Sequence, residues 1–176
     1  MPSRGDSVRV FFALMPPPET REAILAIQGR LDLPGKPVVP QNIHMTLAFL
    51  GQVLEVRLPD LCAIAASVPL NSETLSLDRV GGFPRAAVVF LAPSEVTSGL
   101  IRFQQHLVEA LEQAGFRPDR KRWRPHVTLY RKMRKPCHTM AVEPVEWRIR
   151  DYGLVASILR SNGPEYRLIQ RWNAVE

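Results

Sequence analysis

The sequence of 176 residues contains only two cysteines, Cys62 and Cys137. Two thiols are too few for the disulfide framework of a secreted scaffold, and they suit a reducing cytoplasm. No stretch approaches the ~20 apolar residues that a membrane span requires. Residues 10–15 are apolar but are followed at once by Pro16, so this run is too short for a signal peptide. We therefore expect a cytoplasmic protein outside the secreted and membrane classes.

Glycine-rich phosphate loops are also missing. Neither GxGxxG nor GxxxxGK[ST] occurs in the chain, so dinucleotide-binding and P-loop functions lose their main sequence support. The length predicts a single domain over residues 1–176, with a core large enough to need neither disulfide nor metal. No obligate protein partner is indicated, and a monomer is the default expectation.

Positive charge is present in excess, and it is concentrated in one segment. The chain has 23 Lys and Arg against 17 Asp and Glu, for a net charge of +6. Residues 117–135 hold nine basic residues and one acid, a local charge of +8. The basic residues are Arg117, Arg120, Lys121, Arg122, Arg124, Arg131, Lys132, Arg134 and Lys135. Such a field attracts polyanions and suggests a substrate that carries phosphate.

Hydrophobic periodicity divides the chain into two similar halves. In the first half we expect strands over residues 8–14 and 43–50, the latter ending at Gly51, and helices over 19–31 and 56–68. In the second half we expect strands over 87–91 and 126–130 and a helix over 96–114. A hairpin of strands 152–159 and 166–172 follows. The order predicts an α+β fold with two antiparallel sheets in duplicated lobes that face one another.

A four-residue pattern, His-x-Thr-Leu, opens the second strand of each half. It occurs at residues 44–47 and 126–129. Because side chains alternate along a strand, each His and its Thr share one face, while the residues between them enter the core. If a pseudo-twofold axis relates the halves, both motifs meet in one cleft.

The chemistry that suits two histidines and two threonines is phosphoryl transfer by general acid–base catalysis. One imidazole accepts a proton from the nucleophile while the other donates one to the leaving oxygen. Threonine hydroxyls can hydrogen-bond the phosphate oxygens, where negative charge accumulates. The set is a poor metal site because it offers two nitrogen ligands and no carboxylate, so we expect neither metal nor cofactor.

These residues resemble the 2H phosphoesterase superfamily, and within it the RNA 2′,3′-cyclic phosphodiesterases, historically called 2′-5′ RNA ligases. The resemblance covers nearly the whole chain. It rests on residues 9–24 (RVFFALMPPPETREAI), 42–51 (NIHMTLAFLG), 124–132 (RPHVTLYRK) and the closing strands with Ser157 and residues 163–166. It implies a bilobal α+β fold whose paired motifs line a central cleft. It also implies hydrolysis of an RNA-terminal 2′,3′-cyclic phosphate to a 2′-phosphomonoester, without cofactor, and the reverse 2′-5′ joining of a cyclic-phosphate end to a 5′-hydroxyl.

The resemblance also assigns roles to single residues. His44 is the proton donor to the departing 3′-oxygen, and His126 is the proton acceptor that activates water. Thr46 and Thr128 hold phosphate oxygens. These roles of the two histidines exchange between the forward and reverse reactions.

Two neighbours of the second motif are further candidates. The family pattern places a phosphate-contacting arginine at Arg131, but strict alternation would turn that side chain away from Thr128 unless the strand ends or bulges there. Otherwise Arg131 is one more member of the basic rim. Tyr130 shares the parity of His126 and Thr128, so it either stacks on a base or belongs to the core or rim. Trp123 is a weaker candidate for base stacking.

Two other functions are compatible with the same residues. The chain could be a non-catalytic RNA-binding module, since the basic segment motivates that function equally well. It could also be a phosphodiesterase that acts on small cyclic nucleotides. The charge of residues 117–135 favours a longer polyanion, RNA with a 2′,3′-cyclic phosphate end.

Overall fold

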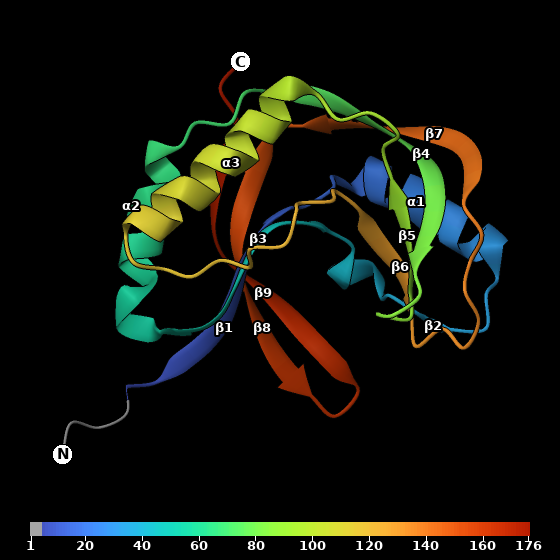
Figure 1. Ribbon diagram of the computed structural model, residues 1–176, viewed down its shortest axis with the longest axis horizontal. Helices are drawn as coiled ribbons and strands as arrows, with labels where there is room; N and C mark the ends of the chain where they lie inside the picture. Colours follow the sequence, from blue (N-terminus) through green and yellow to red (C-terminus); the bar gives the residue numbers. More distant parts are fainter. Residues whose placement is uncertain (1–4) are drawn as a thin grey trace.

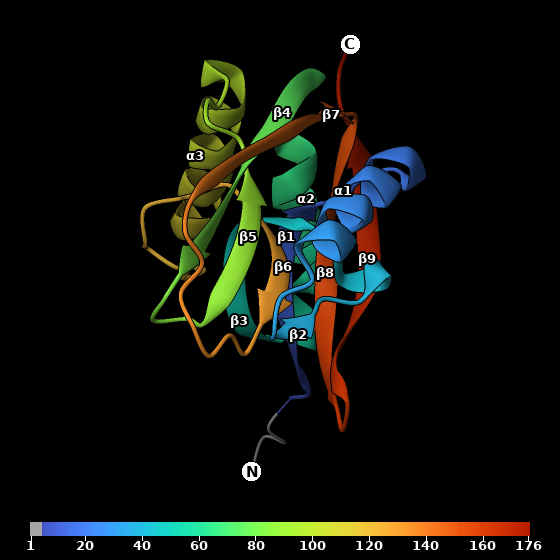
Figure 2. The same ribbon diagram turned by 90° about the vertical axis from the view of Figure 1, so that its right-hand side faces the viewer.

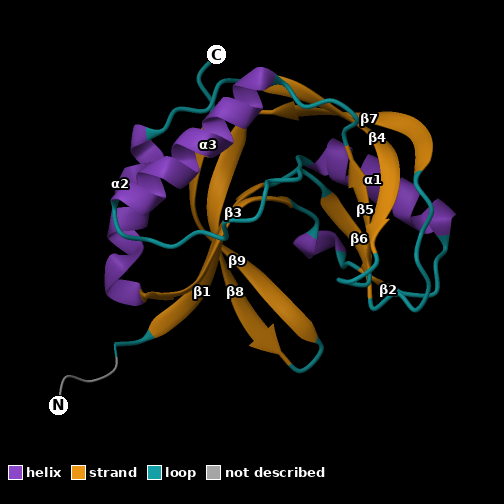
Figure 3. Ribbon diagram, in the orientation of Figure 1, coloured by secondary structure: helices purple, strands orange, loops and turns teal. Residues whose placement is uncertain are grey.

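The computed structural model describes residues 5–176, and within this range the strands form one nine-stranded sheet flanked by three α-helices (Figures 1 and 3). Every ladder of the sheet is antiparallel. The strands are β1 (Ser7–Leu14), β2 (Lys36–Pro37), β3 (Met45–Leu54), β4 (Glu73–Phe83), β5 (Val88–Ala92), β6 (Val127–Arg131), β7 (Met140–Ile149), β8 (Asp151–Arg160) and β9 (Gly163–Asn173). The helices are α1 (Pro18–Leu31), α2 (Leu58–Ser67) and α3 (Ser98–Gln113), with two short 3₁₀ turns at Pro40–Asn42 and Glu55–Arg57.

The strand order shows two lobes with the same plan. It runs β7-β4-β5-β6-β3-β1-β8-β9, with β2 added to β6. We call β3, β1, β8 and β9 the first lobe, and β6, β5, β4 and β7 the second lobe. The predicted α+β fold with paired lobes is confirmed, but the two antiparallel sheets that we expected are joined into one. The two half-sheets meet where Met45 of β3 pairs with Val127 of β6, so the strands that carry the two motifs are neighbours at the centre of the molecule.

Three strands escaped the sequence analysis: the two-residue β2 and the longer β4 and β7. Pro144 lies inside β7 and lacks the N–H that a central strand needs, which argues against a strand in the sequence. It is tolerated because β7 is an edge strand and its register with β4 shifts between Leu77 and Arg79. The prediction that the second strand ends at Gly51 is wrong. Gly51 adopts a positive φ of 69° at a bulge, and β3 continues to Leu54.

The helices of the two halves are exchanged between the lobes. Helix α1, from the first half of the chain, packs against β7 of the second lobe, whereas α3, from the second half, packs against β3 of the first lobe. Figure 2 shows α1 and α3 on opposite sides of the strands between them. Each helix turns an apolar stripe to the sheet, with Ile24 and Ile27 on α1 and Phe103 and Leu107 on α3 buried. The exchange ties the lobes together across the motif strands.

Most buried apolar side chains form a single core that includes residues from both lobes. A second, smaller cluster gathers on β1 and β8, with Phe11, Ala13 and Val155 as its buried members and Phe49 and Tyr166 packed against them. None of the helices described in residues 5–176 has the length and apolarity needed to cross a membrane.

Candidate active site

Both His-x-Thr-Leu motifs face a common cavity of about 600 Å³. His44 and His126 stand directly before β3 and β6, the two strands that meet at the centre of the sheet. The cavity lining includes His44, Thr46, His126 and Thr128, together with Arg131. The structure therefore brings together the four motif residues that the sequence predicted to meet, and it adds the arginine.

The backbone fixes both imidazoles in the same way. Nδ1 of His44 lies 2.6 Å from the carbonyl oxygen of Asn42, and Nδ1 of His126 lies 2.6 Å from that of Arg124. Because a carbonyl oxygen can only accept a hydrogen bond, Nδ1 carries the proton in both rings. The Nε2 atom of each histidine is thereby left for proton transfer. At His44 this atom lies 3.0 Å from Oγ1 of Thr46, whose hydroxyl donates to it when the imidazole is neutral.

Aromatic rings hold each imidazole from two sides. The His44 ring packs against Phe11 and Tyr166, with centroid distances of 5.0 and 5.2 Å. The His126 ring packs against Phe83 and Phe90, at 5.1 and 5.5 Å. Sequence reasoning singled out none of these four rings as site residues, because their strands approach the histidines only in the folded sheet. Such packing restricts rotation of the imidazoles and orients Nε2.

Burial lowers the pKa of both histidines. The pKa of His44 falls from 6.5 to about 4, mainly through desolvation, with the charges of Arg131 and His126 acting in the same direction. The pKa of His126 is also lowered, by desolvation first and by Arg131 second. The Nδ1 hydrogen bonds to the backbone oppose these shifts in both rings. Both imidazoles are therefore neutral near pH 7 when no anion occupies the cavity.

A β-bulge follows the threonine in each motif strand. Ala13 pairs with Thr46 but Phe12 pairs with Ala48, so Leu47 is the extra residue of β3. Phe90 pairs with Thr128 but Val89 pairs with Tyr130, so Leu129 is the extra residue of β6. A bulge adds a residue and resets the alternation of side chains.

The bulge in β6 determines which way the side chains of Arg131 and Tyr130 point. Arg131 returns to the side of Thr128 and lines the cavity, which fulfils the condition for a phosphate contact. Tyr130 turns into the core instead, where it is 5% exposed and its hydroxyl donates to the carbonyl oxygen of Gln28 at 2.7 Å. The expectation that Tyr130 stacks on a base is corrected: it is a core residue. At the matching place in β3, the bulge presents Phe49 to the cavity.

Two buried glutamines, one on α1 and one on α3, each donate a hydrogen bond to the carbonyl oxygen of a bulged leucine. Gln28 of α1 donates through Nε2 to the carbonyl oxygen of Leu129, at 2.8 Å, and also contacts that of Val38. Gln104 of α3 donates to the carbonyl oxygen of Leu47, at 3.0 Å. Each glutamine is 9% exposed. Each half of the chain thus supports the motif of the other half.

The basic segment runs along the cavity rather than away from it. Lys121, Arg122 and Arg124 line the cavity, with Asp119 as the acid. The segment is bound to β3 at two places, through the backbone N–H of Asp119 to the carbonyl oxygen of Phe49 and through Nε1 of Trp123 to that of Thr46, both 2.9 Å. Trp123 also lines the cavity.

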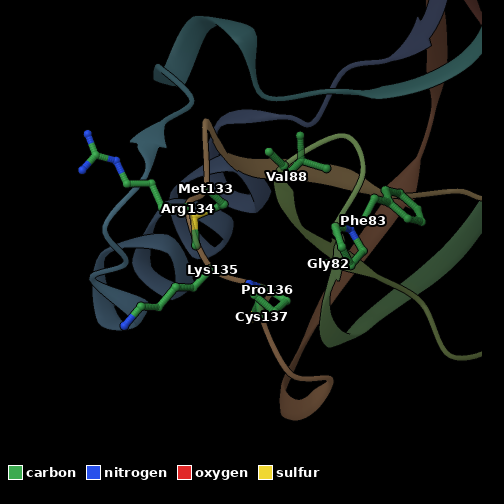
Figure 4. A pocket seen from close by; sticks show the side chains of 10 residues that line it. Gly82, Phe83, Val88, Met133, Arg134, Lys135, Pro136 and Cys137 are labelled. Carbon is green, nitrogen blue, oxygen red and sulfur yellow. The ribbon is translucent and has the colours of Figure 1, made fainter.

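A separate hollow of about 90 Å³ lies between the β4–β5 turn and residues 133–137. Figure 4 shows Arg134 and Lys135 pointing away from it, so the basic side chains do not enter this hollow. It is too small for a nucleotide and is set aside as a substrate site. Within residues 5–176 no group of three or more His, Cys, Asp or Glu side chains could hold a metal ion.

Comparison with known proteins agrees with this geometry. The RNA 2′,3′-cyclic phosphodiesterase of Escherichia coli (strain K12) is 30% identical to this chain, over 93% of this chain and 95% of its own length. That of Archaeoglobus fulgidus is 31% identical, over 91% and 97%. The crystal structure of E. coli LigT complexed with 3′-AMP matches with a TM-score of 0.87 at 28% identity, covering 97% of this chain and 100% of the other.

The family comparison also reproduces the internal repeat. The sequence model described as LigT like Phosphoesterase matches the chain twice, over residues 14–90 and 89–166. Each match contains one His-x-Thr-Leu motif. The two matches cover most of the sequence and confirm the resemblance that the motifs indicated. The chain belongs to the LigT-like phosphoesterase family.

Proposed function

We propose that this protein is an enzyme that hydrolyses the 2′,3′-cyclic phosphate at the end of an RNA to a 2′-phosphomonoester. The proposal rests on two imidazoles that line one cavity. In each, Nδ1 is hydrogen-bonded to the backbone and Nε2 is available for proton transfer. Acid–base cleavage of a phosphodiester needs one proton acceptor and one proton donor, and the pair supplies both. The names of the relatives from E. coli and A. fulgidus support the same activity.

In the proposed reaction each of these groups has a separate role. His126 accepts a proton through Nε2 from the attacking water, and a bond forms between the water oxygen and phosphorus. The bond from phosphorus to the 3′-oxygen breaks, and His44 donates the proton of Nε2 to that oxygen. Thr46 and Thr128 hydrogen-bond the non-bridging oxygens, while Arg131 balances their charge. The 2′-oxygen keeps the phosphate.

The lowered pKa of His44 fits its task only when substrate is bound. A proton donor must be protonated, and the empty site disfavours the imidazolium through burial and through Arg131. The cyclic phosphate brings a negative charge that offsets Arg131 and favours the charged form of His44. The substrate thus raises the pKa of its own proton donor.

We also propose how the chain is organised and where it acts. Residues 1–176 act as a single domain, since the helix of each half packs on the strand of the other lobe. The protein works as a monomer, and its partner is the RNA end. A cytoplasmic location is supported by the two cysteines, which are unpaired in the structure.

The test uses an RNA oligomer that ends in a 2′,3′-cyclic phosphate, with excess EDTA, and determines the position of the phosphate in the product. We expect a 2′-phosphate from the wild-type protein and none from His126→Ala. His106→Ala is the matched control, because His106 is an exposed histidine of α3 outside the cavity. A 3′-phosphate product, loss of activity in EDTA, or full activity of His126→Ala would refute the proposal.

A second substrate class has a specific observation in its favour. The E. coli relative was crystallised with 3′-AMP, a mononucleotide, and a cavity of about 600 Å³ accommodates a single nucleotide. Comparing a cyclic mononucleotide with a cyclic-ended oligomer at rising salt separates the two substrates. We expect the oligomer to be preferred and its advantage to shrink with salt, because the basic lining contacts additional phosphates. A non-catalytic RNA-binding module would bind the oligomer and yield no product at any pH.

A further inference from the structure

A second hollow adjoins the catalytic cavity on the side of His44. It has a volume of about 370 Å³ and shares His44, Thr128 and Arg131 with the catalytic cavity. Its other lining residues belong to three segments, which are residues 36–42, Lys132 directly after β6, and residues 160–166 around the β8–β9 turn. We call this hollow the His44 pocket.

Hydrogen bonds hold the walls of the His44 pocket together. Nζ of Lys36 donates to the carbonyl oxygen of Asn162 at 2.8 Å, which fastens the β8–β9 turn to β2. Nδ2 of Asn42 donates to the carbonyl oxygen of Pro164, also at 2.8 Å. The pairing of Lys36 with Arg131 joins β2 to the end of β6. The pocket is therefore formed by the folded chain before any ligand binds.

The His44 pocket is positively charged and has no acidic lining. No Asp or Glu of residues 5–176 lines it, whereas four basic residues do, Lys36, Arg131, Lys132 and Arg160. Arg160 forms an ion pair, since its Nε lies 2.8 Å from a carboxylate oxygen of Glu165. The other three cations form no ion pair within the described chain. Such a pocket suits an anion with several acceptor oxygens, as a phosphate has.

The His44 pocket suits a phosphate better than a nucleobase. Bases of single-stranded nucleic acids bind proteins largely by stacking on free aromatic rings. Apart from the catalytic imidazole, the aromatic ring in this lining is that of Tyr166. This ring is already packed, edge to face, against His44 at 5.2 Å and against Phe11 at 5.0 Å. What the pocket offers a ligand is therefore mainly its charge.

The proposed reaction determines which phosphate reaches this pocket. His44 donates its proton to the 3′-oxygen, so C3′ of the terminal ribose lies beside His44. C4′ is bonded to C3′ and carries C5′, so it extends beyond His44, away from the reacting phosphorus. C1′ with its base is bonded to C2′ and extends back toward the catalytic cavity. The group on the 5′-oxygen is thus directed to the His44 pocket.

We infer that the His44 pocket binds the phosphate on the 5′-oxygen of the terminal nucleotide, which in an RNA joins this nucleotide to the preceding one. The inference rests on the proposed function and adds a second phosphate site to it. Lys132 and Arg160 contact this second phosphate, and Arg131 lines both hollows. A cyclic nucleotide that lacks a 5′-phosphate leaves the pocket empty and is a poorer substrate.

The experiment measures kcat/KM for three substrates, uridine 2′,3′-cyclic phosphate, the same nucleotide with a 5′-phosphate, and a dinucleotide with a cyclic end. Lys132→Asn is the first pocket variant, because Lys132 lines the pocket but not the catalytic cavity. Asn tolerates the positive φ of 56° at this position. Arg160→Gln is the second pocket variant. Lys135→Asn is the matched control, since it removes the same charge at an exposed position that lines neither hollow.

We expect the wild-type protein to prefer both substrates with the additional phosphate about tenfold over uridine 2′,3′-cyclic phosphate, because each gains charged hydrogen bonds. Lys132→Asn and Arg160→Gln should each lower this preference several fold and leave kcat/KM for uridine 2′,3′-cyclic phosphate nearly unchanged. Lys135→Asn should change neither quantity. No preference in the wild-type protein, or an equal fall in the control, overturns the inference. A preference for the 5′-phosphorylated mononucleotide that the dinucleotide does not share also overturns it.

A binding measurement separates failure of the inference from failure of the proposed function. Titration calorimetry compares uridine 2′-phosphate with uridine 2′,5′-bisphosphate, the expected products of the two mononucleotides, and needs no turnover. If the wild-type protein hydrolyses all three substrates equally well, the inference is overturned and the proposed function stands. If no hydrolysis occurs, the proposed function fails. Tighter binding of the bisphosphate, lost in Lys132→Asn but not in Lys135→Asn, then still supports a phosphate site in the pocket, and equal binding refutes it.

Discussion

The two lobes share a scaffold but present different side chains to the cavity. In both, a motif histidine bonds through Nδ1 to the carbonyl oxygen two residues before it, and a bulge follows the motif threonine. After the bulge the first lobe presents Phe49 and the second lobe presents Arg131. The first lobe packs its histidine against Phe11 and Tyr166, which belong to a separate apolar cluster, whereas the second lobe packs its histidine against Phe83 and Phe90.

This difference suits the asymmetric reaction that we propose for a repeated structure. A symmetric site would give both imidazoles the same environment and the same tendency to hold a proton. Here His44 is desolvated strongly enough to bring its pKa to about 4, and Arg131 and His126 add to that shift. The duplication supplies two oriented imidazoles, and the residues around them give the two rings different surroundings.

Removal of either imidazole should have the largest effect on activity. We expect His44→Ala and His126→Ala each to lower kcat about 10²- to 10⁴-fold, because each removes one of the two proton transfers. The double variant should be little worse than the more affected single variant, since the two groups act as a unit. Steady-state kinetics on the cyclic-ended oligomer measures this, with thermal unfolding to verify the fold. Multiplicative losses in the double variant would show that the two histidines act independently.

An exchange of Phe49 and Arg131 tests the difference between the lobes directly. Arg131→Phe should lower kcat/KM about 10²-fold, because the charge that stabilises the phosphate in the transition state is lost. Adding Phe49→Arg to that variant should not restore activity, since the cation would then come from β3 instead of β6. Arg134→Phe is the control for loss of a neighbouring charge, because Arg134 is exposed and does not line the catalytic cavity. Restoration by the double exchange would mean that the lobes are functionally equivalent.

The two glutamines test whether the lobes depend on each other. Gln28→Leu and Gln104→Leu each remove a buried donor from the carbonyl oxygen of a bulged leucine. We expect each to lower the free energy of unfolding by about 1–3 kcal/mol. Each should also lower kcat several fold, because the bulge positions a motif threonine. Gln105→Leu, an exposed neighbour on α3, is the control in urea unfolding and kinetics. Loss of stability with unchanged kcat would limit the glutamines to a structural role.

The lowered pKa values of the two histidines should shift the pH profile of kcat/KM modestly toward lower pH. In the free enzyme the histidine pair holds a single proton only between its two lowered pKa values. Therefore kcat/KM should rise as the pH increases through about 4, and it should fall again at a pH below 6.5. In kcat the alkaline limb should lie at higher pH, because bound phosphate stabilises the imidazolium. An alkaline limb of kcat/KM above pH 6.5 would contradict the burial of the pair.

The motifs can be read directly from the sequence, and most of the helices and strands could be predicted because they depend on the pattern of neighbouring residues. The repeated His-x-Thr-Leu, the helices and the closing hairpin all follow from periodicity within short windows. The resemblance supplied the bilobal plan. The aromatic neighbours of the histidines depend instead on how strands pair, which no single window contains.

One feature of β6 determines the positions of both Tyr130 and Arg131. Both depend on the extra residue Leu129 in β6, which turns Tyr130 into the core and Arg131 to the cavity. Strict alternation gives the opposite assignment, and nothing in the five letters of the strand signals a bulge. The carbonyl oxygen of the extra residue is bonded by Gln28, a partner 101 residues away in the chain.

The division of labour between the two histidines can be measured with a substrate in which sulfur replaces the bridging 3′-oxygen. A thiolate leaves without a proton, so this substrate needs the acceptor but not the donor. We predict that His44→Ala recovers most of its lost activity on the sulfur substrate, whereas His126→Ala stays as impaired as on the oxygen substrate. Equal recovery of both variants, or recovery of His126→Ala alone, would contradict the assignment of His44 as donor and His126 as acceptor.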